Sequence, residues 1–247
     1  MRKHVIAGNW KMYKTAGQTV EFIRAFASPT PQAEIVICPP FPNLAAAVEA
    51  ARGTAIEIGA QDVFWLKEGA YTGEVSAPML QAVGCRWVII GHSERRQYFG
   101  ETDETVLKKT AAALEAELKP IVCVGERLEE REAGSTEAVL ATQFSQGIAP
   151  LTPEQFARIV IAYEPVWAIG SGKTATPEMA AAAHGFLRSQ AAARYGGAAA
   201  AACRILYGGS VKPDNASSLM AQEEIDGALV GGASLDPASF AAIVAAC

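Results

Sequence analysis

The stretch RIVIAYE, residues 158–164, is a short apolar run that ends directly in a carboxylate, and similar runs recur along the chain. Continuous apolar runs, rather than alternating ones, are typical of parallel strands that are covered on both faces. We therefore predict eight parallel strands. The other seven runs are HVIAG (4–8), EIVICP (34–39), AIEIGA (55–60), RWVIIG (86–91), PIVCVG (120–125), RILYGG (204–209) and DGALVGG (226–232).

The segments between these runs carry apolar residues at helical spacing, and each is long enough for the crossover that a parallel strand requires. Thr176-Pro177 and Asp236-Pro237 each place an N-capping side chain before a proline at the first helical position, which predicts two helix starts. We interpret GGAAAAACR (196–204) as a helix end followed by a loop. The predicted helices cover 18–28, 44–52, 105–118, 135–146 and 176–194, and one more follows Pro237.

Eight alternating strand and helix units in 247 residues match the size and rhythm of a (β/α)8 barrel, an α/β fold with outer helices. We predict that residues 1–247 form one such domain. A doubly wound open sheet would usually carry GxGxxG after its first strand, where this chain has NWKMYK (9–14). Because barrels place their chemistry at the carboxyl ends of strands, the residues after each apolar run are the candidate site residues.

Composition argues against several classes of function. The net charge is −5 with both signs interspersed, so neither a nucleic-acid-binding nor a membrane-binding surface is expected. No apolar run approaches the ~20 residues of a membrane span, and the apolar part of MRKHVIAGNWK (1–11) is too short for a signal peptide. The five cysteines form no CxxC pair and the three histidines no HExxH pair, so we expect no disulfide, no metal and a reducing cytoplasm.

Polar side chains follow the first and fourth predicted strands. Asn9 and Lys11 would offer an amide and a fixed cation to an anionic substrate, the alternative being a turn residue and a solvated lysine. His92 precedes Ser93, a good N-cap, so the free amides of a helix beginning at Glu94 would donate to the imidazole and favour its neutral form. A buried structural histidine is the alternative, and Glu94 either shares this site or simply begins a charged helix.

Glu164 closes the sixth strand. A carboxylate at the end of so apolar a strand is unfavourable unless it meets solvent or a substrate. We expect desolvation to raise its pKa, as a general base that works near neutrality requires. The alternative is a carboxylate paired with an arginine or a backbone amide, but barrel geometry places this side chain at the mouth and favours function.

The last two strand ends are rich in glycine, with YGGSVKP (207–213) and LVGGASLDP (229–237). Glycines let backbone amides approach a ligand closely, and barrels often hold phosphate with these two loops. Two such ends in succession, one followed by Ser210, predict a phosphate site. Cys123 lies within the fifth strand and is interpreted as a core residue.

The segment AIGSGKTAT (168–176) resembles a nucleotide-binding P-loop but does not match it. GxxxxGK[ST] requires a glycine where this chain has Trp167, and a P-loop lysine lies at a helix start, whereas the helix signal here begins at Thr176. We therefore reject an NTPase. The glycines and apolar residues of 165–175 instead predict a lid that excludes water when it closes, with Lys173 near its hinge.

The chain closely resembles the triosephosphate isomerase family along its whole length. The segments that carry the resemblance are GNWKM (8–12), CPPFPNL (38–44), GAQDV (59–63), GAYTGEVSAPML (69–80), IIGHSERR (89–96), PIVCVGE (120–126), AYEPVWAIGSGKTAT (162–176), LYGGSVKPDN (206–215) and DGALVGGASLDP (226–237). The resemblance implies a TIM barrel that interconverts dihydroxyacetone phosphate and D-glyceraldehyde 3-phosphate without a cofactor, in glycolysis and gluconeogenesis.

The resemblance also implies roles for single residues. Glu164 is the base, His92 the neutral electrophile, and Lys11 and Asn9 stabilise negative charge, with Glu94 in the same catalytic set. The phosphate contacts it implies are made, mainly through backbone amides, by Gly170, Ser171, Ser210, Gly231 and Gly232. A non-catalytic barrel that binds phosphosugars is the second hypothesis, although a dead copy need not retain all these groups.

The family is usually a homodimer, and the resemblance implies an interface through the long loop 61–78, with Thr72 at its tip near the partner's Lys11 loop. A lid over the chain's own site is the alternative for this loop. Three residues depart from the family pattern. Tyr13 and Asp62 replace asparagines on segments expected near the interface, and Ser171 replaces a threonine but keeps its hydroxyl.

Overall fold

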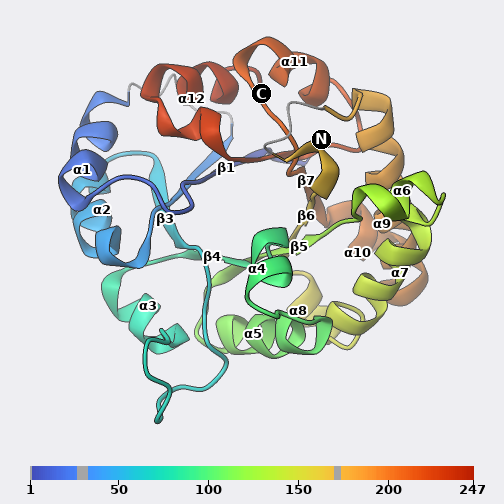
Figure 1. Cartoon of the computed structure of the whole chain (residues 1–247), viewed down its shortest axis with the longest axis horizontal. Helices are drawn as coiled ribbons and strands as arrows, with labels where there is room; N and C mark the ends of the chain where they lie inside the picture. The colour runs from blue at the N-terminus through green and yellow to red at the C-terminus, as the bar shows by residue number, and fades with distance from the viewer. Residues whose placement is uncertain (1, 27–32, 170–173) are drawn as a thin grey trace.

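The computed structural model describes residues 2–26, 33–169 and 174–247. Its strands form a closed barrel in which each strand pairs in parallel with its neighbour in chain order and β8 returns to β1. Helices surround the barrel (Figure 1), so the predicted (β/α)8 class is confirmed. The strands are β1 Val5–Asn9, β2 Glu34–Cys38, β3 Ile56–Ala60, β4 Trp87–Ile90, β5 Lys119–Val124, β6 Val160–Tyr163, β7 Arg204–Tyr207 and β8 Gly227–Val230.

Helices occupy the connections between strands, and none in the described ranges is both long and apolar enough to cross a membrane. The α-helices are α1 Ala16–Ala25, α2 Leu44–Ala51, α3 Ala77–Val83, α4 Ser93–Tyr98, α5 Asp103–Glu115, α6 Leu128–Glu132, α7 Thr136–Gly147, α8 Pro153–Phe156, α9 Pro177–Tyr195, α10 Gly197–Ala202, α11 Pro213–Met220 and α12 Pro237–Val244. The short 3-10 helices are η1 Phe41–Asn43, η2 Val166–Ala168 and η3 Gly232–Leu235.

Both predicted proline-marked helix starts are confirmed. The Thr176 hydroxyl accepts from the Met179 amide at 3.2 Å, and Asp236 accepts from the Ser239 amide at 2.8 Å. The prediction of a loop after residue 196 was wrong, because the alanine run forms α10. Alanine has the highest helix propensity, so the run forms a helix again once Gly196, at φ 89°, has ended α9.

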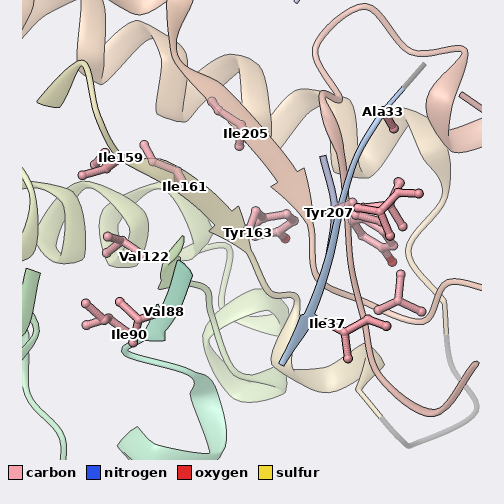
Figure 2. Packing of buried hydrophobic residues seen from close by; sticks show 14 of the residues in the cluster. Ala33, Ile37, Val88, Ile90, Val122, Ile159, Ile161, Tyr163, Ile205 and Tyr207 are labelled. Atoms are coloured by element: carbon pink, nitrogen blue, oxygen red, sulfur yellow. The ribbon is translucent and has the colours of Figure 1, made fainter. Parts of the chain in front are cut away.

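The core has two layers, because successive strand residues face opposite sides of the sheet. Residues facing the barrel interior form one buried cluster, which includes Val160 and Ala162 of β6. The residues between and after them, Ile161 and Tyr163, belong to the second cluster, which fills the space between barrel and helices (Figure 2). The same alternation directs Glu164, the next residue after β6, toward the interior at the rim of the barrel.

Barrel closure brings β8 and β1 into unusually close contact at Gly227. This residue has φ 132°, and a Cβ placed on it would lie 2.0 Å from the carbonyl oxygen of Val5. Only glycine adopts this conformation without strain, and no side chain could be accommodated without moving β1.

We expect Gly227→Ala to destabilise the fold by at least about 3 kcal/mol, since it combines a strained backbone with a clash against the main chain. Gly197→Ala is the control, because nothing lies within 4 Å of its added methyl group and it stands in a helix. The control should be neutral or stabilising by roughly 0.5 kcal/mol. Denaturant unfolding measures both, and equal stabilities of the two variants would contradict the role assigned to Gly227.

Candidate active site

A cavity of about 720 Å³ opens at the carboxyl ends of the strands, where barrel folds place their chemistry. Its lining combines charged side chains with the two glycine-rich loops. The predicted site residues that line it are Asn9, Lys11, His92, Glu164, Ser210, Gly231 and Gly232. Gly170, Ser171 and Lys173 lie outside the described residues.

The end of β1 fixes the lysine of the site. The Asn9 side chain accepts from the Lys11 amide at 3.0 Å, and this bond holds Lys11 at a positive φ of 49°. Gln61 donates to the Lys11 carbonyl at 2.9 Å and secures the turn from the other side. The ammonium group lies 2.5 Å from a carboxylate oxygen of Glu94, so Glu94 holds the cation at the cavity wall. Glu94 does not itself line the cavity.

His92 is held by the start of α4. The prediction that Ser93 caps this helix was wrong, because His92 is the N-cap and its own ring Nδ1 accepts from the Glu94 amide at 3.2 Å. The ring performs the capping that a serine hydroxyl would otherwise provide. A ring nitrogen that accepts from an amide carries no proton, so the proton of the neutral ring lies on Nε2. Nε2 is 2.9 Å from Oε1 of Glu164.

Glu164 is buried at the inner rim of the barrel, with 1% of its surface exposed. Its Oε2 accepts from the Ser93 amide at 2.9 Å, so both free amides at the start of α4 serve the site. Within the described part of the chain, no hydrogen bond of good geometry reaches Oε1, whose close neighbour is the His92 ring. The carboxylate is therefore held at one oxygen and is less firmly fixed at the other.

The two groups shift each other's pKa. Burial acts to lower the pKa of His92, but the adjacent carboxylates of Glu164 and Glu94 raise it on balance. Burial acts to raise the pKa of Glu164, but His92, the Ser93 amide and Lys11 lower it on balance. The expected rise in the pKa of Glu164 was therefore wrong for this arrangement, because desolvation is outweighed by the contacts that the sequence could not show.

The two glycine-rich loops also line the cavity. A Cβ on Gly208 would lie 2.8 Å from Cγ of Glu164, and one on Gly209 would lie 2.2 Å from the Tyr207 hydroxyl. These glycines leave room that any side chain would fill. Asn215 donates to the Ser210 carbonyl at 3.0 Å and fixes the first loop, while Gly231 and Gly232 lead into η3. The arrangement leaves backbone close to the space that a ligand would occupy.

The segment after β6 is tied to the barrel before it reaches the undescribed residues. Trp167 donates through its indole nitrogen to Glu126 at 2.9 Å, and the hydroxyl of Tyr163 lies 3.1 Å from the same oxygen. Glu126 is completely buried. Ile169 lines the cavity, and the other end of the segment is fixed where Thr176 caps α9.

The loop from 61 to 78 does not line the cavity. It projects beyond the ring of helices between β3 and α3 (Figure 1), and Thr72 within it is exposed. Phe64 stacks on Trp65 and contacts Tyr71, which gives the loop a small aromatic core of its own. Because the loop does not line the cavity, the alternative interpretation of this loop as a lid over the chain's own site is wrong for the observed arrangement.

Tyr13, the other predicted interface residue, is 57% exposed and lines the cavity.

Sequence reasoning missed the positioning role of three groups, although each lies within a segment that it named. The Ser93 amide, the Glu126 carboxylate and Gly208 all contact Glu164 or the segment that follows it. Glu126 had a detectable signal, since it follows a strand end as Glu164 does. No group of histidine, cysteine, aspartate or glutamate residues suited to a metal occurs in the ranges that the structure describes.

The fold and site define a barrel protein in which a buried carboxylate, a histidine and a lysine converge beside two glycine-rich loops. The family model of triosephosphate isomerase matches residues 4–247. Triosephosphate isomerases of Solibacter usitatus, Moorella thermoacetica and Citrifermentans bemidjiense are 68%, 59% and 57% identical over 247 residues, covering 99% of this chain and 98–99% of each relative. The chain belongs to the triosephosphate isomerase family.

We expect Glu164→Gln to lower the pKa of His92. The carboxylate is the largest influence that raises this pKa, and burial, which remains in the variant, favours the neutral ring. Imidazole signals followed by NMR titration measure the change. His184 is the internal control, because burial lowers its pKa to about 4 independently of Glu164. An unchanged His92 titration would contradict the pairing.

Proposed function

We propose that this protein interconverts dihydroxyacetone phosphate and D-glyceraldehyde 3-phosphate through an enediolate, without a cofactor. The observation that carries the proposal is the contact between Glu164 and His92 in a cavity that the two glycine-rich loops also line. Membership of the family supports it, as do relatives that bear the name triosephosphate isomerase. In this proposal residues 1–247 act as one domain.

Glu164 is the proposed base that moves the proton between the two adjacent carbons. The substrate has to take the place of the His92 contact at Oε1, because that oxygen faces the ring. When the carboxylate turns to the substrate, the largest influence that raises the pKa of His92 is weakened. Substrate binding therefore favours the neutral ring that an electrophile requires.

His92 is the proposed electrophile. Because Nδ1 accepts from the Glu94 amide, the proton on Nε2 is available to a substrate oxygen. A weakly acidic carbon proton leaves more easily when the neighbouring oxygen receives such a hydrogen bond. Lys11 and Asn9 stabilise the negative charge that develops, and Glu94 keeps the ammonium group in place.

The phosphate contacts are proposed at Ser210, Gly231 and Gly232, together with Gly170 and Ser171 of the lid 165–175. Glycine at these positions allows amides to approach the dianion. A closed lid would keep water from the enediolate and prevent loss of phosphate.

The four buried cysteines and Cys247 are all free, which supports a reducing compartment such as the cytoplasm.

We expect Glu164→Gln to lower kcat by roughly 10²–10⁴-fold, since a positioned base contributes about that much. Lys11→Met should impair both substrate binding and rate, because it removes the cation that Glu94 holds at the cavity wall. Lys108→Met is the control, since Lys108 is exposed on α5, pairs with Glu104 and does not line the cavity. A coupled assay of triose phosphate interconversion measures all three variants.

An inactive but folded wild-type protein would overturn the proposal. Binding of a triose phosphate without turnover would instead support the second hypothesis, a non-catalytic phosphosugar-binding barrel. Isothermal titration with the substrate, run beside the assay, separates these two results.

A homodimer through the loop 61–78 is part of the proposal. Large apolar side chains are exposed on the β1–α1 connection, on the loop and α3, and at the end of α4. They are Met12 and Tyr13, Leu66, Tyr71, Met79 and Val83, and Tyr98 and Phe99. Exposed apolar groups of this number are typical of a surface that another protein covers.

We expect Thr72→Arg to shift the protein from dimer to monomer, because a charged side chain at the loop tip would be buried without a partner. Ala198→Arg, on the exposed face of α10, should leave the assembly unchanged. Sedimentation velocity at micromolar concentration distinguishes the two states. A wild-type protein that sediments only with the mass of one chain would contradict the dimer.

A further inference from the structure

One side-chain amide on α7 replaces a missing strand beside Glu164. Gln143 accepts from the Gly125 amide at 2.7 Å and donates to the Gly125 carbonyl at 3.1 Å. The carboxamide therefore binds one residue at both backbone groups, as a peptide unit of a neighbouring strand would. None of the sequence motifs pointed to Gln143.

The position of Gly125 explains why a surrogate is needed. Its neighbours direct their carbonyls at the β6 side, where Val124 accepts from the Glu164 amide at 2.8 Å and Glu126 from the Val166 amide at 3.1 Å. Backbone groups of a strand alternate between its two edges, so Gly125 faces the β4 edge. The pairing of β4 with β5 ends at Ile90, which lies opposite Val122, so β4 offers no backbone partner to Gly125.

Gly125 is in direct contact with the base. A Cβ on Gly125 would lie 1.7 Å from the carbonyl oxygen of Glu164, so the two main chains touch there. Any shift of Gly125 would move the backbone that carries the carboxylate. The next residue, Glu126, holds Trp167 at the start of the lid segment.

Gln143 itself is held firmly. Its helix packs against the barrel through Leu140 and Phe144, both buried, so the carboxamide has a fixed origin. Gln143 also lines a polar cavity of about 400 Å³ that Ser93 and Glu164 line as well. This cavity is separate from the glycine-rich loops, so a change at Gln143 leaves the phosphate side of the site untouched.

We propose that Gln143 is a positioning residue for the proposed isomerisation, which holds Glu164 in register with the substrate carbons by clamping Gly125. The inference rests on the proposed function. Gln143 affects the chemical step rather than substrate binding, because it holds the backbone next to the base and does not contact the phosphate loops. Displacing a base by a fraction of an ångström slows proton transfer while leaving ground-state contacts intact.

The test compares Gln143→Met with Gln146→Met in the full chain. Methionine keeps the length of the side chain but removes both bonds to Gly125. Gln146 is exposed on the same helix and lines the same polar cavity, and its side chain makes no hydrogen bond to another described residue, so it is the matched control. The readouts are kcat, KM for the triose phosphate and the thermal midpoint.

For Gln143→Met we expect kcat to fall roughly 10- to 100-fold, as for other misplaced catalytic groups. KM and the thermal midpoint should stay close to those of the wild type, and Gln146→Met should behave as the wild type. A kcat within twofold of the wild type, or an equal loss in the control, would overturn the proposal. So would a loss in which KM rises as much as kcat falls.

Gln143→Glu provides a second variant in case methionine prevents folding. It keeps an acceptor for the Gly125 amide and loses the donor to the carbonyl, so kcat should lie below the wild-type value with KM unchanged. A wild-type kcat in this variant would count against the clamp.

Hydrogen exchange at the Gly125 amide tests the clamp without reference to catalysis. Exchange should be faster in Gln143→Met, whereas the Gly208 amide, bonded to the Tyr163 carbonyl at 2.7 Å, should be unaffected. An inactive wild type with this exchange pattern would overturn the function and keep the clamp. An active wild type with unchanged exchange would overturn the clamp alone.

Discussion

The site depends on keeping one ionised carboxylate buried at the rim of the barrel. Glu164 is almost without solvent, and an unpaired charge there would be strongly unfavourable. The His92 ring, the Ser93 amide and Lys11 offset that cost, the first two supplied by the start of α4 and the third by the connection after β1. Glycines at 125 and 208 leave space on either side, so the main chain approaches the carboxylate where side chains could not. The base is thus stabilised by groups that the substrate can partly replace.

The same alternation that builds the core delivers these groups. In β6 the interior residues Val160 and Ala162 are followed two places later by Glu164, and in β1 Val5 and Ala7 are followed by Asn9. A strand whose inward-facing residues are apolar up to its carboxyl end therefore presents the next inward-facing residue, a polar one, at the mouth of the barrel. Stability and function are separated along the strand axis, since the residues below the rim fill the barrel and those at the rim meet the ligand.

The fold could be predicted from the sequence because each strand is a continuous apolar run and because Thr176-Pro177 and Asp236-Pro237 mark helix starts. The candidate residues at the strand ends could be predicted for the same reason. Their pairings could not, since the contact of Glu164 with His92 joins residues more than 70 positions apart. The direction of the Glu164 pKa shift was missed on this account. Gln143 was missed because nothing in a helical glutamine distinguishes a backbone clamp from a solvated side chain.

The contacts of Asp62, which the sequence analysis named as a departure from the family pattern, give a physical reason for an acid at this position. It lies buried at the root of the projecting loop, 2.6 Å from the ammonium group of Lys109 and 2.9 Å from the guanidinium group of Arg95. Glu101 pairs with the same two cations and also accepts from the Gly91 amide, directly before His92. The buried Lys109 and the partly buried Arg95 then face two carboxylates, whereas an asparagine at position 62 would leave one positive charge unbalanced. The acid at this position therefore belongs to a charge network that joins the loop root to the histidine of the site.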